Sequence, residues 1–302
     1  MNRRQMLRRT GLAALLLGTS PWCRSWLRAA DAPKKRVLMF TRSQGYEHDV
    51  VKRKGGGLSL AEQIVTDLGP KHGYEVVCEK DGRVFLSSDF PKFDAFLFET
   101  QGDLGAEKSL DGAPPVPPEG KKALLDGVAA GKGFVGCHCA SDTYHSQGGR
   151  WEGQERGKLD PYIAMLGGEF IHHGSQQTAT MHVADPHFPG LKDVKDFELK
   201  EEWYSLKNFA PDLHVILVQQ TKGMKDADYE RPDFPATWAR KHEKGRVFYT
   251  SMGHRDDVWK NETFQKMLMG GLAWALRDVD AEVPPNLEKV AAKANELPKE
   301  KK

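Results

Sequence analysis

The 302-residue sequence contains only four cysteines, and one of them lies within the first thirty residues. The remaining three, Cys78, Cys137 and Cys139, are an odd number, which argues against a disulfide framework. Cys137 and Cys139 would point to opposite sides of an extended strand and could not easily pair with each other. We therefore expect free thiols.

Long apolar runs are also lacking. Residues 11–18 are apolar but too few to span a bilayer as a stable helix. Arg3 and Arg4 precede this run, and Ala29 and Ala30 follow it. This order is typical of a twin-arginine export signal, so we predict a signal at residues 1–30 and a periplasmic or extracellular mature protein. The alternative is an uncleaved membrane anchor.

The chain has no strong excess of charge of either sign. Its formal net charge is +2, and the first thirty residues supply six arginines and no acid, which leaves −4 for the mature chain. No basic stripe remains that would suit a nucleic acid, and no later apolar run is long enough for stable membrane insertion. We therefore expect a small-molecule partner, and a homo-oligomer stays open.

The order of the expected elements predicts an α/β fold. Strands and helices alternate in the first half, which favours a parallel sheet with helices on both faces. The second half adds strands, a hairpin and a closing helix. We expect strands at 36–40, 74–78, 93–100, 133–138, 178–183, 197–204, 213–220, 236–242 and 246–251, and helices at 58–68, 118–130, 160–166 and 263–276. We predict one domain over residues 31–282 and a flexible, charged tail at 283–302.

The most informative segment is residues 133–143. A short apolar run, Phe134 and Val135, ends abruptly in small and polar residues, as a buried parallel strand does before a tight turn. Ligands of open α/β sheets bind at the carboxyl ends of such strands. His138 lies between Cys137 and Cys139, and we expect it to occupy the exposed tip of the turn.

Other ionisable residues follow predicted strands and would share this edge of the sheet. The candidates besides His138 are His48, Glu99, Asp142, His172, His173, Glu201, Glu202 and His254. His172 and His173 are adjacent and cannot both point into one pocket. The aromatic rings of Trp203 and Tyr204 suggest that one of the two preceding carboxylates lies in a walled site.

Each candidate also has a structural interpretation. A single histidine after a strand is often a hydrogen-bonded loop residue rather than a functional one. Trp203, Tyr204 and Trp238 could stack on a sugar ring or pack in the core. Cys137 or Cys139 could be a nucleophile, although the expected geometry buries both thiols.

Three histidines with one or two carboxylates suit a divalent metal such as zinc, manganese or iron. The possible ligands are His48, His138 and His254, which would come from separate loops. The spacing does not match a specific metal motif, so the sequence leaves a metal as one possibility.

The segment 134–143 resembles the corresponding segment of ThuA-like (trehalose-utilisation) proteins. Further similar stretches follow in the same order along the chain, so that the resemblance as a whole spans residues 36–276. They are residues 45–48, 167–173, 185–187, 201–204 and 235–254.

This resemblance implies a flavodoxin-like, class I glutamine amidotransferase-like fold, a three-layer sandwich with a mainly parallel central sheet. It also implies that His138 stands where true amidotransferases have the nucleophilic cysteine. Carried over by position, the site residues are His48, His138, Asp142, His173, Glu202 and His254. The family is linked to the catabolism of disaccharides and keto-sugars.

Three hypotheses follow. The first is an exported enzyme that acts on a glycoside or its 3-keto derivative, with His138 as base, Asp142 orienting it, and His254 or His48 as acid or as ligands of a metal. Glu202 belongs to this catalytic set. His48, Glu99, His173, Trp203, Tyr204 and Trp238 would bind substrate. The second is a sugar-binding or scaffold protein without catalysis, and the third is a cysteine hydrolase.

Overall fold

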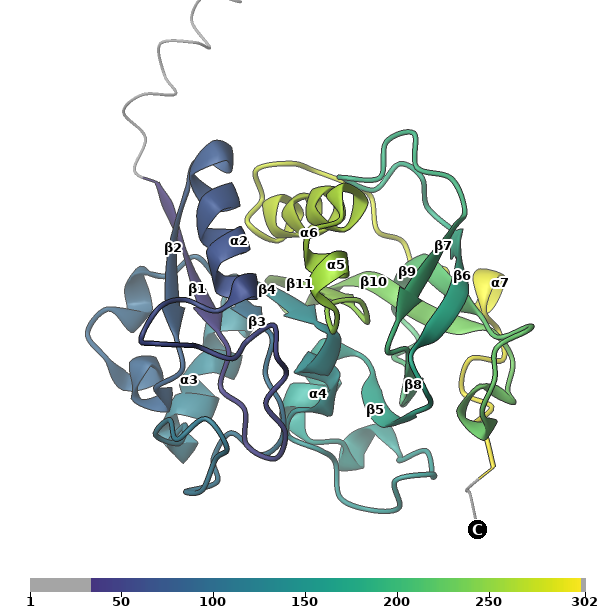
Figure 1. Ribbon diagram of the computed structural model, residues 1–302, viewed down its shortest axis with the longest axis horizontal. Helices are drawn as coiled ribbons and strands as arrows, with labels where there is room; N and C mark the ends of the chain where they lie inside the picture. Colours follow the sequence, from purple (N-terminus) through teal and green to yellow (C-terminus); the bar gives the residue numbers. More distant parts are fainter. Residues whose placement is uncertain (1–33, 300–302) are drawn as a thin grey trace, which may run out of the picture. The chain divides into compact units, whose positions relative to one another are not determined.

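The computed structural model describes residues 34–299, so the predicted export signal lies outside the described residues. Figure 1 shows the ribbon. The strands are β1 (Lys35–Phe40), β2 (Tyr74–Glu79), β3 (Ala95–Phe98), β4 (Gly133–Cys137), β5 (Glu169–His173), β6 (Gln177–Val183), β7 (Phe197–Glu201), β8 (Tyr204–Lys207), β9 (His214–Gln220), β10 (Phe234–His242) and β11 (Gly245–Thr250). The α-helices are α2 (Leu60–Leu68), α3 (Pro118–Ala129), α4 (Pro161–Leu166), α5 (Asp256–Trp259), α6 (Glu262–Ala275) and α7 (Leu287–Val290).

A nine-stranded sheet runs through the domain in the order β2-β1-β3-β4-β11-β10-β9-β6-β7. The five strands from β2 to β11 are parallel to one another. The next four strands extend the sheet by antiparallel pairs. The predicted hairpin is present as β10 and β11.

Alternating side chains of the central strands build a core on each face of the sheet. On β1, Leu38 and Phe40 join one cluster, which α3 and α4 cover, while Val37 and Met39 join the other, which α2 and α6 cover. Figure 1 shows α2 and α6 on one side of the sheet and α3 and α4 on the other. Two buried faces explain why these strands are almost wholly apolar.

The strand predicted at 197–204 is wrong in one respect, because it breaks at Glu202 and Trp203. Its first part is β7, at the edge of the large sheet, and its second part is β8, which pairs with β5 in a separate two-stranded sheet. The sequence did not predict β5. This break matters for the site, because it places Glu202 between two sheets instead of within a regular strand.

Parallel strands bring the loops that follow them to one edge of the sheet. Strands β1, β3, β4 and β11 are neighbours, and their carboxyl ends lead into the segments that carry His48, Glu99, His138 and His254. The common edge predicted for these residues is therefore confirmed. None of the helices among residues 34–299 is long and apolar enough to cross a membrane.

The tail expected to be flexible from residue 283 is packed against the domain over most of its described length. Leu287 and Ala294 are buried in the core. The Asn286 side chain bonds the backbone of Val215 through both of its polar atoms. The charged composition suggested a solvated tail, but its few apolar residues are spaced to cover β9.

Candidate functional site

His138 lies in a strained turn directly after β4. Its φ of 37° is in the left-handed region, which non-glycine residues rarely adopt, and a short 3-10 turn, His138–Asp142, follows. Gly136 allows this turn to approach closely, since a Cβ there would lie 3.1 Å from Ala140 and Tyr249. Contrary to the expected exposed tip, the His138 side chain is 0% exposed, because the loops of the other strands close over it.

The two ring nitrogens of His138 have different surroundings. Nδ1 lies 2.9 Å from the backbone carbonyl of Ser251, which can only accept, so Nδ1 carries the hydrogen and donates it. Nε2 has no hydrogen-bond partner among the described residues. The ring packs on Tyr204 with a centroid distance of 3.9 Å. The ring is therefore fixed with the Nε2 lone pair available.

The orienting role predicted for Asp142 is wrong. Its carboxylate lies 2.5 Å from His145 Nε2 and accepts a hydrogen bond from Gln101 at 2.7 Å. The carbonyl of Ser251 orients His138 instead. Sequence reasoning could not find this contact, because any residue at position 251 offers the same backbone oxygen.

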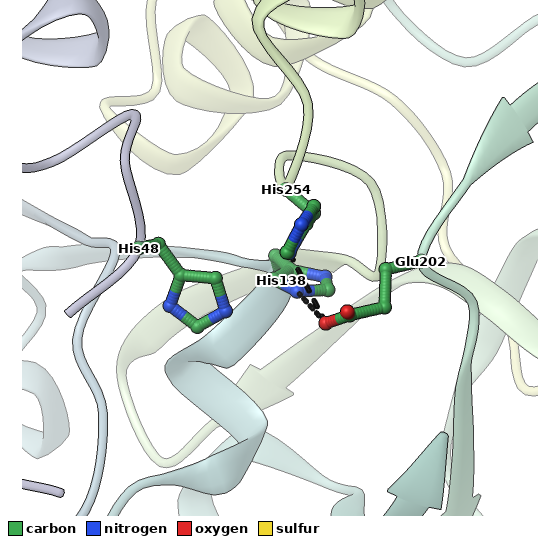
Figure 2. Close-up of side chains that lie close together, drawn as sticks. All are labelled: His48, His138, Glu202 and His254. Carbon is green, nitrogen blue, oxygen red and sulfur yellow. Dashed lines mark ion pairs between the residues drawn. The ribbon is translucent and has the colours of Figure 1, made fainter. Parts of the chain in front are cut away.

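Four side chains meet around the free nitrogen of His138. One potential ligand atom from each of His48, His138, Glu202 and His254 lies within 4.8 Å of the others. Glu202 Oε2 is 3.1 Å from His254 Nδ1 and 3.6 Å from His138 Nε2. Figure 2 shows the three rings and the carboxylate converging from separate segments. We call these residues the His3Glu cluster.

Burial and mutual charge set the protonation of the cluster. Burial lowers the pKa of His48 and of His138, which favours the neutral form of both imidazoles. Burial would raise the pKa of Glu202, but its contacts with His138 and His254 outweigh burial and hold the pKa well below its usual range. Burial would lower the pKa of His254, but the contact with Glu202 raises it.

This donor set fits a divalent cation. Metal ligands must offer lone pairs, which neutral imidazoles and an ionised carboxylate do. The observation that supports this fit is the buried Nε2 of His138, which accepts no hydrogen bond from any described residue, since a buried acceptor without a donor is costly. Nitrogen and oxygen donors suit zinc, manganese or iron.

A pocket of about 200 Å³ opens onto the cluster. Of the predicted site residues, His48, Asp142, His173, Glu202 and Tyr204 line it. Tyr46, Gln101 and Phe170 complete the lining, and sequence reasoning missed these three. Tyr46 lies in the same short motif as His48, and Gln101 lies two residues after Glu99. Their closeness in sequence to predicted site residues could have identified these two.

Three residues predicted to bind substrate do not line this pocket. Trp203 and Trp238 are fully buried in the two cores, and their indole nitrogens bond the carbonyls of Gln177 and Leu166. Glu99 is also fully buried, and burial raises its pKa well above the usual value. The core interpretation of both tryptophans is therefore correct.

The three cysteines in the described part of the chain, Cys78, Cys137 and Cys139, are free thiols, as predicted. Cys137 and Cys139 are fully buried, and burial raises the pKa of each thiol well above its ordinary value. Cys139 donates to Glu99 at 3.5 Å. A nucleophilic cysteine needs an accessible thiolate, so this environment disfavours the cysteine-hydrolase hypothesis.

Comparisons with known proteins agree with the fold. The family model described as trehalose utilisation, ThuA, matches residues 36–275. The structure of a ThuA-like protein from Bacteroides uniformis is similar, with 17% identity and a TM-score of 0.58 over 85% of this chain and 97% of that chain. A ThuA-like protein from Parabacteroides merdae has 18% identity and a TM-score of 0.55 over 83% and 94%. A comparison with curated proteins gave no match. The predicted flavodoxin-like α/β fold is confirmed.

Proposed function

Because the chain belongs to the ThuA trehalose-utilisation family, we propose that it acts on a disaccharide or other glycoside, or on its 3-keto derivative, by histidine acid–base chemistry. The family supports a carbohydrate-related role. The observation that carries the enzymatic proposal is the Nε2 atom of His138, which has no hydrogen bond among the described residues and lies 3.6 Å from Glu202, a residue that lines the pocket. A protein that only binds sugar has no need of such a group.

The protonation of the cluster supports a division of roles. A keto group acidifies the neighbouring C–H bond of a sugar, so His138 Nε2 can take that proton and the glycosidic oxygen then leaves from the next carbon. His254 has a raised pKa and faces Glu202, so it can hold the proton that the leaving oxygen needs. Paired groups whose pKa values are pushed apart are typical of acid–base catalysis.

We further propose that the His3Glu cluster holds a divalent cation. A cation bound there would polarise a keto or hydroxyl oxygen of the substrate. His138 has one Nε2 lone pair, which either accepts a proton or binds the metal. In a metal-bound form, His138 and His254 would hold the cation, and the base would have to be another group lining the pocket. Dependence of turnover on added metal distinguishes the two forms.

The test is product analysis with the purified mature protein. A panel of disaccharides and their 3-keto derivatives is incubated with the wild type, with His138→Ala and with the control His182→Ala, whose histidine is exposed and pairs with Asp196. We expect turnover of a keto-glycoside that falls at least about 100-fold in His138→Ala and is unchanged in His182→Ala.

Unchanged turnover in His138→Ala would contradict the proposed base. Binding of sugars without any turnover, with or without added metal, would favour the alternative of a non-catalytic sugar-binding or scaffold protein.

We also propose that the protein is exported through the twin-arginine route. The support is the order of Arg3, Arg4, the short apolar run and the small residues after it. Replacing both arginines by lysine should retain the protein inside the cell, as fractionation would show. Export of the double variant at the wild-type level would contradict this proposal.

A further inference from the structure

We propose that a second pocket beside the cluster binds the second ring of a two-ring substrate, and that Tyr46 is the platform between the two rings. This inference rests on the proposed function and names the residues that select the leaving part of the substrate. The second pocket, of about 320 Å³, is lined by Tyr46, Asp49, Gln176, His254, Arg255, Asp256 and Asp257.

The two pockets adjoin at the cluster. Tyr46 lines both of them. His254 lines the second pocket, and its Nδ1 lies 3.1 Å from Glu202, which lines the first. The first pocket, at about 200 Å³, is smaller than the roughly 300–1,000 Å³ of typical small-molecule sites, whereas the two together fall within that range. A ligand that fills both must therefore pass Tyr46 and His254.

Tyr46 is suited to be a rigid platform. Its side chain is 56% exposed, and it is the aromatic member of the large apolar side chains exposed among residues 34–299. Its backbone N–H donates to Gln101 Oε1 at 2.7 Å, and its ring meets the ring of His48 edge-on at 4.8 Å. An anchored aromatic ring can pack on the apolar face of a sugar while its hydroxyl stays in water.

The walls of the second pocket carry groups that bond sugar hydroxyls. Gln176 lies between His254 and Arg255, with its Nε2 at 2.9 Å from His254 Nε2 and its Oε1 accepting from Arg255 at 2.6 Å. Arg255 also pairs with Asp257. Gln176 therefore contacts the ring nitrogen of His254 that does not face Glu202, and Arg255 and Asp257 extend this polar wall of the second pocket.

This arrangement places His254 at the junction of the two rings. In a substrate with one ring in each pocket, the oxygen that joins the rings lies beside Tyr46 and His254. That oxygen is the leaving group of the proposed elimination. The ring in the second pocket is then the part of the substrate that departs.

The experiment is equilibrium binding by calorimetry to the mature protein. The ligands are trehalose and methyl α-glucoside and, in the His138→Ala background that stops the proposed turnover, the 3-keto derivative of each, so that one ligand of each pair has two rings and the other has one. The variants are Tyr46→Ala, Asp49→Ala and the control Leu58→Ala, an exposed residue of the same long loop that lines neither pocket.

We expect the two-ring ligand to bind the wild type about ten-fold more tightly than the one-ring ligand. Tyr46→Ala should weaken both ligands, and the two-ring ligand more strongly. Asp49→Ala should weaken mainly the two-ring ligand, and Leu58→Ala should weaken neither.

Equal affinity for both ligands, or no effect of Tyr46→Ala and Asp49→Ala, would overturn the second-ring subsite. The proposed carbohydrate-related function would remain. If none of the four sugars binds, the proposed function itself fails and the subsite fails with it.

Discussion

At the scale of single residues, His138 combines two features that each cost free energy and that the rest of the fold must offset. A left-handed backbone at a non-glycine residue costs about 1–3 kcal/mol, and strain of this kind gathers at functional sites. The buried Nε2 atom, which has no hydrogen-bond partner within residues 34–299, adds about 1–3 kcal/mol. Ser251, Tyr204 and the close packing at Gly136 hold the ring in place. A ligand or proton at Nε2 would remove the second cost.

His145 makes a pH-dependent contribution to stability. Its ring lies between Asp142 and Glu169, at 2.5 and 3.1 Å. Burial alone would lower the pKa of His145, but the two ion pairs outweigh burial and raise the pKa to about 9. Because the folded pKa lies above the unfolded value of about 6.5, the contribution is complete below that pH and is lost as pH rises through about 9.

We therefore expect the free energy of unfolding of the wild type to fall between pH 7 and about pH 9 more than that of His145→Gln. Urea denaturation at a series of pH values measures both. Parallel pH profiles for the two proteins would show that the ion pairs of His145 do not stabilise the fold.

At the scale of elements, strand ends could be predicted and strand breaks could not. His48, His138 and His254 each follow an apolar strand, and parallel pairing alone brings such positions to one edge. Glu202 joins them because the chain leaves the large sheet after β7. The alternation of residues 197–204 fits one continuous strand, so only the pairing of β8 with β5 reveals the break.

The same break separates Trp203 from Tyr204. Trp203 points into the core beside α6, whereas Tyr204 begins β8 and faces His138. Both aromatic side chains are equally suited to line a sugar-binding site or to pack in a core. A sequence cannot tell which side of a sheet an aromatic residue faces when the strand's own limits are misplaced.

Helix α7 tests whether the carboxyl-terminal segment is part of the fold. Leu287 is 3% exposed and packs in the core, while its neighbour Glu288 is exposed. We expect Leu287→Ala to lower the free energy of unfolding by about 2–5 kcal/mol and Glu288→Ala to change it by less than about 0.5 kcal/mol. Chemical denaturation measures both values. If Leu287→Ala lowered the free energy of unfolding as little as Glu288→Ala, this segment would contribute no stability in solution.

At the scale of the whole molecule, the domain is a two-core sandwich whose candidate site lies at one edge of the sheet. The apolar central strands and the alternating helices made this architecture predictable from sequence. The antiparallel extension from β10 to β7 was predicted as strands, but their order was not, because it depends on pairing between residues far apart in the chain. Glu202, the carboxylate of the cluster, follows directly after β7, the last strand of that extension.

Since the four ligands come from separate segments, a bound cation would tie much of the fold together. A ligand that binds only the folded state adds about 2.7 kcal/mol to the free energy of unfolding when its free concentration is 100 times its dissociation constant. For a domain of this size that corresponds to a rise in melting temperature of about 5 °C or more. Chelation should therefore lower the melting temperature of the wild type.

The matched pair for this measurement is Glu202→Gln, which removes the ionised ligand, and Glu198→Gln, which changes an exposed glutamate on β7. Chelator should leave Glu202→Gln unaffected and lower the melting temperature of Glu198→Gln as it does in the wild type. Metal analysis of each purified protein gives the stoichiometry. A wild type that carries no metal and does not respond to chelator contradicts the cation site, and the Nε2 atom of His138 is then free to act as the base.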